Sequence, residues 1–151
     1  MSTLTPREHE FLDAALASYT GVSSNAPIPV RALGLNDRTQ FKAEVGRLRR
    51  AVAERATLNH IDAARVLFLS ELAFGSDLLG AGVEFQLVSA IRDDEAVAIL
   101  RTLQRKLYTR DGAKALSARP LCPLIFRARN RADVDDTRGC IPLRKEIHDI
   151  G

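Results

Sequence analysis

Three stretches of the 151-residue chain combine residue types that could do chemistry, and the first is rich in glycine. Gly75, Gly80 and Gly82 have the spacing of a phosphate-binding loop, whose backbone N–H groups surround a phosphate. That chemistry also requires a lysine and a serine or threonine after the spaced glycines, whereas Ala81 and Gly82 stand there in this chain. The sequence therefore favours a helix end followed by a turn at 75–82.

The second stretch is the acidic run Asp93-Asp94-Glu95. Neighbouring carboxylates are typical of acid–base or metal sites. The run also falls in the first turn of an expected helix, where the positive end of the helix dipole favours anions, and this position explains the residues without a catalytic role. An enzyme with an unrecognised site near residues 75–95 remains one alternative for the function.

The third set comprises Cys122, Cys140 and His148. Thiols and imidazoles can bind zinc or act as a nucleophile and its base, but this spacing fits no common zinc signature. The sequence therefore predicts no metal and no cofactor. In a reducing compartment the cysteines are expected as free thiols, with a Cys122–Cys140 disulfide as the alternative.

Charge is distributed unevenly along the chain. Residues 1–100 have 10 Lys+Arg and 13 Asp+Glu, whereas residues 101–151 have 12 Lys+Arg and 6 Asp+Glu. Part of the second excess is the basic end of a helix, because residues 111–151 alone have 8 Lys+Arg against 6 Asp+Glu. The remaining cations lie on a segment interrupted by proline, and we predict partner-binding residues among them: Arg119, Arg127, Arg129, Arg131 and Arg138.

An extended segment would direct the alternate arginines 127, 129 and 131 to one side, as a positive ridge. Such a ridge favours an acidic protein surface as the partner, with the phosphates of a nucleic acid as the alternative. For nucleic acid, a second predicted contact is the polar face of the helix expected at 37–55, with Arg47, Arg49 and Arg50. Few aromatic residues are near the ridge for base stacking.

The elements that must position these residues are predicted to be helices. Thr5, Pro6 and Glu8 form a capping box with proline in the first turn. Apolar residues at helical spacing predict four long helices, at 5–19, 37–55, 59–74 and 93–110. The third is apolar almost all round and is therefore expected at the centre of the fold. Asp111-Gly112 is expected to end the fourth, before a short helix at 113–118.

Residues 83–91 are ambiguous. Val83, Phe85 and Leu87 alternate with polar residues, which predicts a short strand, but Val88 interrupts the alternation and leaves a helix as the alternative.

The predicted fold is a mainly α, single-domain helical bundle. Its helical body spans 1–118, and an irregular, Pro-interrupted basic arm at 119–151 is expected to pack on the same domain. No apolar run approaches the about 20 residues that span a bilayer, and the N-terminus has no secretion signal, so we expect a cytoplasmic protein that does not enter membranes.

Because no catalytic constellation is evident, we expect a small intracellular non-enzymatic protein-interaction module that acts as an adaptor, regulator or neutralising partner. Its basic C-terminal surface would meet an acidic protein. A nucleic-acid-binding regulator is the first alternative, and homo-oligomerisation remains open.

Overall fold

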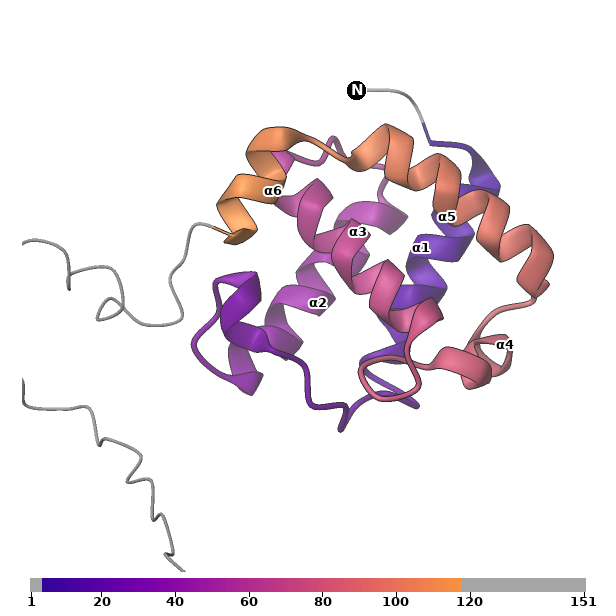
Figure 1. Ribbon diagram of the computed structural model, residues 1–151, viewed down its shortest axis with the longest axis horizontal. Coiled ribbons are helices and arrows are strands. Elements are labelled where there is room, and N and C mark those ends of the chain that lie inside the picture. The colour runs from indigo at the N-terminus through magenta and orange to yellow at the C-terminus, as the bar shows by residue number, and fades with distance from the viewer. Residues whose placement is uncertain (1–3, 118–151) are drawn as a thin grey trace, which may run out of the picture. The chain divides into compact units, whose positions relative to one another are not determined.

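A computed structural model describes residues 4–117, and all regular structure in this range is helical (Figure 1). The predicted mainly α fold with about four long helices is confirmed. In chain order the helices are α1 (Pro6–Ser18), the 3₁₀-helix η1 (Val30–Leu33), α2 (Arg38–Ala53), α3 (His60–Gly75), the 3₁₀-helix η2 (Gly82–Glu84), α4 (Phe85–Val88), α5 (Asp93–Leu107) and α6 (Arg110–Ser117).

The first helix begins as the capping box predicts. The Thr5 hydroxyl accepts a hydrogen bond from the Glu8 N–H at 3.2 Å, and the Glu8 carboxylate accepts one from the Thr5 N–H at 2.6 Å. These reciprocal bonds satisfy backbone donors that have no partner within the helix. The apolar stripe predicted for this helix is buried throughout: Phe11, Leu12, Ala15, Leu16 and Tyr19.

Helix α3 lies at the centre of the described residues, as its apolar sequence predicts. It packs against α1, α5 and α6, and in Figure 1 it runs between them. Asn59 caps its start by accepting from the N–H groups of Ile61 and Asp62, each at 2.9 Å. A helix with neighbours on several sides needs apolar residues on each of those sides, which explains its weakly amphipathic sequence.

Aromatic contacts join the helices into one core. The ring centroids of Phe11 and Phe85 are 5.3 Å apart, and Phe74 lies 5.5 Å from Phe85 and 6.1 Å from Phe11. These three rings fix α1, the end of α3 and α4 against one another. At the C-terminal end of α1, the buried Tyr19 packs edge-on against Phe41 of α2.

The strand predicted at 83–91 is wrong, and the helical alternative is correct for most of this segment. η2 leads directly into α4. Phe85 and Ile91 are buried in the core and Val88 packs against it, while Val83 and Leu87 are 84% and 77% exposed. The alternating apolar residues therefore do not form one face of a strand, because those on either side of Phe85 point to solvent.

The predicted end of the fourth helix is also wrong. Helix α5 ends at Leu107, and Thr109 then caps α6 by accepting from the N–H of Gly112 at 3.0 Å. Gly112 lies within α6, where a Cβ atom would lie only 2.5 Å from the carbonyl oxygen of His60. This glycine therefore permits close packing of α6 on α3 instead of ending a helix.

Candidate functional site

A groove between α3 and α5 is the described surface that combines charge, an aromatic ring and an apolar floor. Its volume is about 480 Å³. We call it the α3–α5 groove, and its lining residues are Leu67, Glu71, Arg101, Gln104, Arg105 and Tyr108. Leu67 is buried, whereas Tyr108 is 60% exposed and free to contact a partner.

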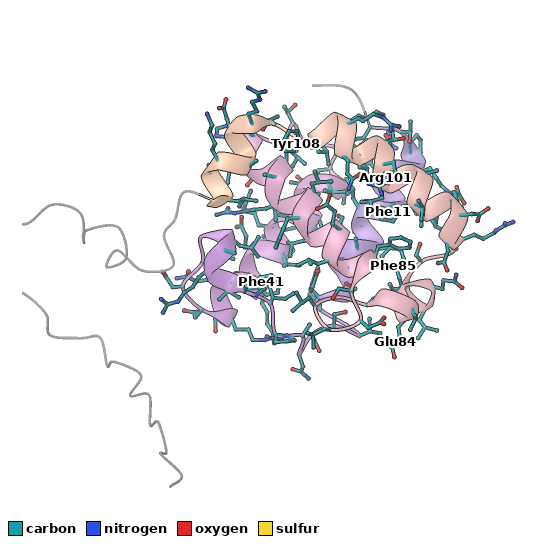
Figure 2. The ribbon with its side chains drawn as sticks, in the orientation of Figure 1. Phe11, Phe41, Glu84, Phe85, Arg101 and Tyr108 are labelled. Carbon is teal, nitrogen blue, oxygen red and sulfur yellow. The ribbon has the colours of Figure 1, made fainter. Side chains whose placement is uncertain are left out.

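One face of α5 positions the residues of the groove. Arg101, Arg105 and Tyr108 follow at intervals of four and three residues, so helix geometry brings them to the same side. Figure 2 labels Arg101, on α5, and Tyr108, the residue that follows this helix. The buried stripe of the same helix, with Ile99, Leu103 and Leu107 among its members, anchors α5 to the core.

A chain of hydrogen bonds orients the first arginine of the groove. Arg101 donates from Nη1 to Oε1 of Gln104 at 3.0 Å, and Gln104 donates from Nε2 to Oε1 of Glu71 on α3 at 2.7 Å. Arg105 donates to the hydroxyl of Thr102 at 3.1 Å. Both guanidinium groups therefore have neutral hydrogen-bond acceptors, and neither is within salt-bridge distance of a carboxylate in residues 4–117.

Several arginines that hold the helices together differ from Arg101 and Arg105 in that they pair with carboxylates. Within residues 4–117, carboxylates within 4.0 Å compensate five arginines: Arg7, Arg47, Arg49, Arg65 and Arg92. An arginine without such a partner keeps its charge available to a ligand. Arg38 and Arg50 also have no carboxylate within 4.0 Å in residues 4–117, so the position beside Tyr108 in the groove is what distinguishes Arg101 and Arg105.

The α2 arginines predicted to contact nucleic acid do not form one free basic face. Arg47 donates to both Glu44 and Asp62, and Arg49 donates to Asp13 at 2.7 Å. Arg50 is exposed. The hydrogen bonds that Arg47 donates to Glu44 and to Asp62 raise its pKa, in that order of size, so its charge is fixed within the fold. The other predicted partner-binding residues lie outside the described residues: Arg119, Arg127, Arg129, Arg131 and Arg138.

The glycine-rich stretch forms a closed turn, as expected from its missing lysine. The N–H of Gly80 donates to Ser76 O, that of Ala81 to Ala73 O and that of Leu79 to the Ser76 hydroxyl, each at 2.9 to 3.0 Å. These donors are used by the chain itself and do not surround a phosphate. A Cβ atom on Gly80 would lie 1.9 Å from the carbonyl oxygen of Leu72, so only glycine fits here.

The same turn borders a second hollow, of about 380 Å³, between residues 22–27 and residues 77–84. We call it the 22–27/77–84 pocket. Asp93, Asp94 and Glu95 are not among its lining residues, so the two parts of the enzyme site predicted near 75–95 do not meet there. The acidic run instead begins α5, where Glu95 pairs with Arg7 and Asp94 with Arg92.

No group of three or more His, Cys, Asp or Glu side chains in residues 4–117 could hold a metal ion. Within the same residues, no helix has the length and apolar character needed to cross a membrane. Cys122, Cys140 and His148 lie outside this range.

The groove residues could have been found from the sequence. Arg101 and Arg105 belong to the basic second half of the helix expected at 93–110, where cations complement the dipole, and that role hides their place beside Tyr108. The signal in the sequence is the spacing of two cations and an aromatic residue, Arg101, Arg105 and Tyr108, at intervals of four and three residues beside the buried stripe. The contribution of α3, from Leu67 and Glu71, carries no comparable signal.

In comparisons with known proteins, no family model, no curated protein and no solved structure matches this chain.

Proposed function

We propose that this protein is a protein-interaction module that binds an acidic segment of a partner protein in the α3–α5 groove. One observation supports the proposal above the others: Arg101 and Arg105 lie beside the exposed ring of Tyr108 without a carboxylate partner in the described part of the chain.

The composition of the groove favours a protein ligand. Arginine and tyrosine are enriched among the residues that contribute most to protein–protein binding, because each offers a large contact area together with hydrogen-bond donors. Leu67 and the ring of Tyr108 add apolar surface for a hydrophobic side chain of the partner. An acidic residue next to an apolar one would satisfy both features of the groove.

Nucleic acid is a weaker interpretation of the same surface. Residues 4–117 have 15 Lys+Arg and 14 Asp+Glu, so the described body has almost no net positive charge. Non-specific binding to phosphates depends on many uncompensated cations. Arg47 and Arg49 are both engaged by carboxylates.

The C-terminal arginines predicted as partner-binding residues have the same sign of charge as the groove. They would favour the same class of partner, because positive charge on a protein accelerates its association with an acidic protein. The proposal does not depend on them.

The test is an NMR titration of the full-length protein with an amidated peptide of alternating glutamate and leucine. We expect saturable shifts at Arg101, Gln104, Arg105 and Tyr108, and we expect them to weaken with salt. The double variant Arg101→Glu/Arg105→Glu should reduce affinity at least tenfold. Arg50→Glu is the matched control, because Arg50 is an exposed arginine on another helix, and it should leave affinity unchanged.

Three results would overturn the proposal. One is the absence of saturable shifts up to millimolar peptide. Another is equal binding of a peptide in which lysine replaces glutamate. The third is tighter binding of a random DNA duplex through the same residues, with a steep salt dependence, since that would assign the groove to phosphates.

A further inference from the structure

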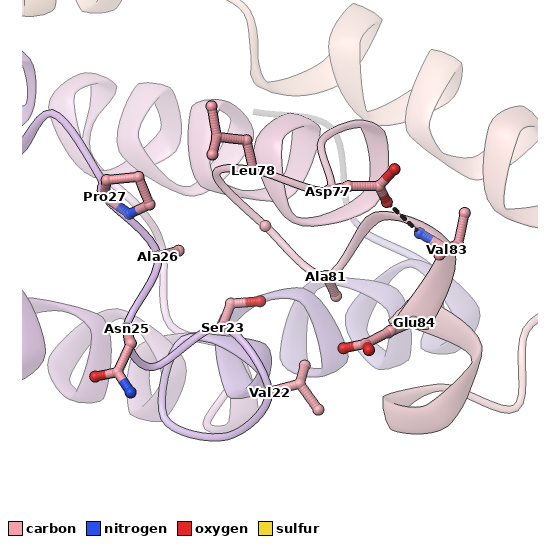
Figure 3. A pocket seen from close by; sticks show the side chains of 11 residues that line it. Val22, Ser23, Asn25, Ala26, Pro27, Asp77, Leu78, Ala81, Val83 and Glu84 are labelled. Atoms are coloured by element: carbon pink, nitrogen blue, oxygen red, sulfur yellow. Dashed lines mark hydrogen bonds between the residues drawn. The ribbon is translucent and has the colours of Figure 1, made fainter.

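The 22–27/77–84 pocket has a chemistry opposite to that of the α3–α5 groove. Its two walls are the connection after α1 and the turn after α3, and Figure 3 shows them facing one another. Asp77 and Glu84 are the ionisable residues of the lining, and no lysine or arginine of the described chain is among them. The pocket therefore presents negative charge.

Both walls are held in place by hydrogen bonds. Arg38 donates to the backbone carbonyls of Ala26, at 2.7 Å, and Ser24, which fixes the first wall. Asp77 accepts from the N–H of Val83 at 2.8 Å and closes the second wall (dashed in Figure 3). A pocket whose walls are already fixed loses little conformational entropy when a ligand binds.

A buried hydroxyl without a partner marks the floor. Ser23 is only 5% exposed, and its Oγ atom has no hydrogen-bond partner among the described residues. Buried polar atoms are normally hydrogen-bonded, and an unsatisfied one costs free energy that a ligand could recover. Figure 3 shows the Ser23 hydroxyl and the Glu84 carboxylate on facing sides of the pocket, both directed into the space between the walls.

Exposed apolar side chains surround the opening. Leu78 and Val83 line the pocket and are 70% and 84% exposed, and Val22 borders the opposite wall. Leu87, one helical turn after Val83, extends the apolar surface onto α4. Clustered exposed apolar residues around a polar hollow are typical of a surface that binds another protein.

We propose that the 22–27/77–84 pocket binds a lysine side chain of a basic, leucine-containing segment in a partner protein. The ammonium group pairs with the Glu84 carboxylate and donates to the Ser23 hydroxyl. The aliphatic stem and a neighbouring apolar side chain of the segment lie against Leu78, Val83 and Leu87. This surface is separate from the α3–α5 groove, so the proposal does not depend on whether the groove binds an acidic partner.

The test is a titration of the full-length protein with an amidated peptide of alternating leucine and lysine, followed by NMR and calorimetry. We expect saturable shifts at residues 22–27 and 77–84. Glu84→Gln should weaken binding about tenfold, and Ser23→Ala by a smaller factor. Glu54→Gln is the control, because Glu54 is an exposed glutamate at the end of α2 with no partner in the pocket, and it should bind as the wild type does.

Four results would overturn the proposal. Unchanged peptide affinity in Glu84→Gln would show that Glu84 forms no ion pair with the ligand. Equal binding of a leucine–glutamate peptide would show that the pocket has no preference for a cation. Binding of 1,5-diaminopentane as tightly as the peptide would assign the pocket to free alkylamines. Concentration-dependent self-association of the wild type, abolished by Glu84→Gln and by Arg101→Glu, would assign it to a second copy of the chain.

Discussion

The Nζ atom of Lys106 lies 2.8 Å from Oε2 of Glu8, although the two residues are 98 positions apart in the chain. Glu8 is only 3% exposed. Its carboxylate therefore has two roles: it completes the capping box of α1 through the Thr5 N–H, and it fixes the end of α5 against the start of α1.

Removing this carboxylate should destabilise the fold. Glu8→Ala deletes a helix cap and leaves a half-buried ammonium without this partner, so we expect the free energy of unfolding to fall by about 2 kcal/mol. Urea denaturation at pH 7 measures it. Glu10→Ala is the control, because its exposed ion pair with Arg7 should contribute less than about 0.5 kcal/mol. Equal effects of the two substitutions would contradict the assigned role of Glu8.

The same carboxylate should make stability depend on acid pH. Burial raises the pKa of Glu8, but the hydrogen bond from Lys106 and the bonds with Thr5 outweigh it, and the net pKa lies below its ordinary value. A group with a lowered folded pKa stabilises the protein above its unfolded pKa, about 4.3, and loses that contribution as the pH falls through the folded value. The stability difference between wild type and Glu8→Gln should be constant from pH 7 to 5 and shrink below about pH 4.

Asp62 should contribute more to stability than an exposed carboxylate in an ion pair. It is 7% exposed and accepts from Arg47 and from Asn59, each at 3.0 to 3.1 Å. Asp62→Ala should lower the free energy of unfolding by about 2 kcal/mol, because the charged hydrogen bonds of a buried carboxylate are lost. The comparison is Asp13→Ala, whose exposed pair with Arg49 should contribute less than about 0.5 kcal/mol. Chemical denaturation of both variants measures the two losses of unfolding free energy, and equal losses would contradict the larger contribution assigned to Asp62.

Two glycine-to-alanine substitutions should change the stability of the fold in opposite directions. At Gly80 a Cβ atom would lie 1.9 Å from Leu72 O, so Gly80→Ala should destabilise the protein by about 2 kcal/mol or more. At Gly46, within α2, nothing lies within 4 Å of the added carbon, and Gly46→Ala should stabilise by about 0.5–1 kcal/mol. Thermal unfolding of the two variants measures the difference, and a stabilising Gly80→Ala would refute the close approach.

Ser70 offers a stabilising substitution in the core. It is fully buried in α3, and its hydroxyl has no hydrogen-bond partner among the described residues. Ser70→Ala removes this unsatisfied group and improves helix propensity, so stability should rise by about 0.5–1 kcal/mol. A loss of stability on urea denaturation would mean that the hydroxyl has a partner.

Much of the fold was predictable because the signals are local. Thr5 with Glu8 and Asn59 with Asp62 mark helix starts within three or four residues, and the stripe from Phe11 to Tyr19 repeats at the period of the helix. The failures occurred where local signals were ambiguous. Alternation at 83–87 suggested a strand, yet the burial of Phe85 against Phe11 decided its conformation.

The candidate sites were less predictable because each combines segments distant in sequence. The sequence shows Arg101, Arg105 and Tyr108 on one face of a helix, but not that Leu67 and Glu71 complete a groove there. Nothing near Ser23 indicates that Glu84 faces it.

The sequence by itself determined where the long helices lie and which of their faces are buried, since capping, helix propensity and apolar periodicity depend on neighbouring residues. The tertiary structure decided which charges are compensated from one helix to another. Arg47 and Arg101 are both arginines on polar helix faces, yet packing of α2 near α3 brings Asp62 to the first, and the second has only neutral acceptors in the described chain. Ion pairing falls off over a few ångströms, so the availability of a charge to a partner follows from the packing of the helices.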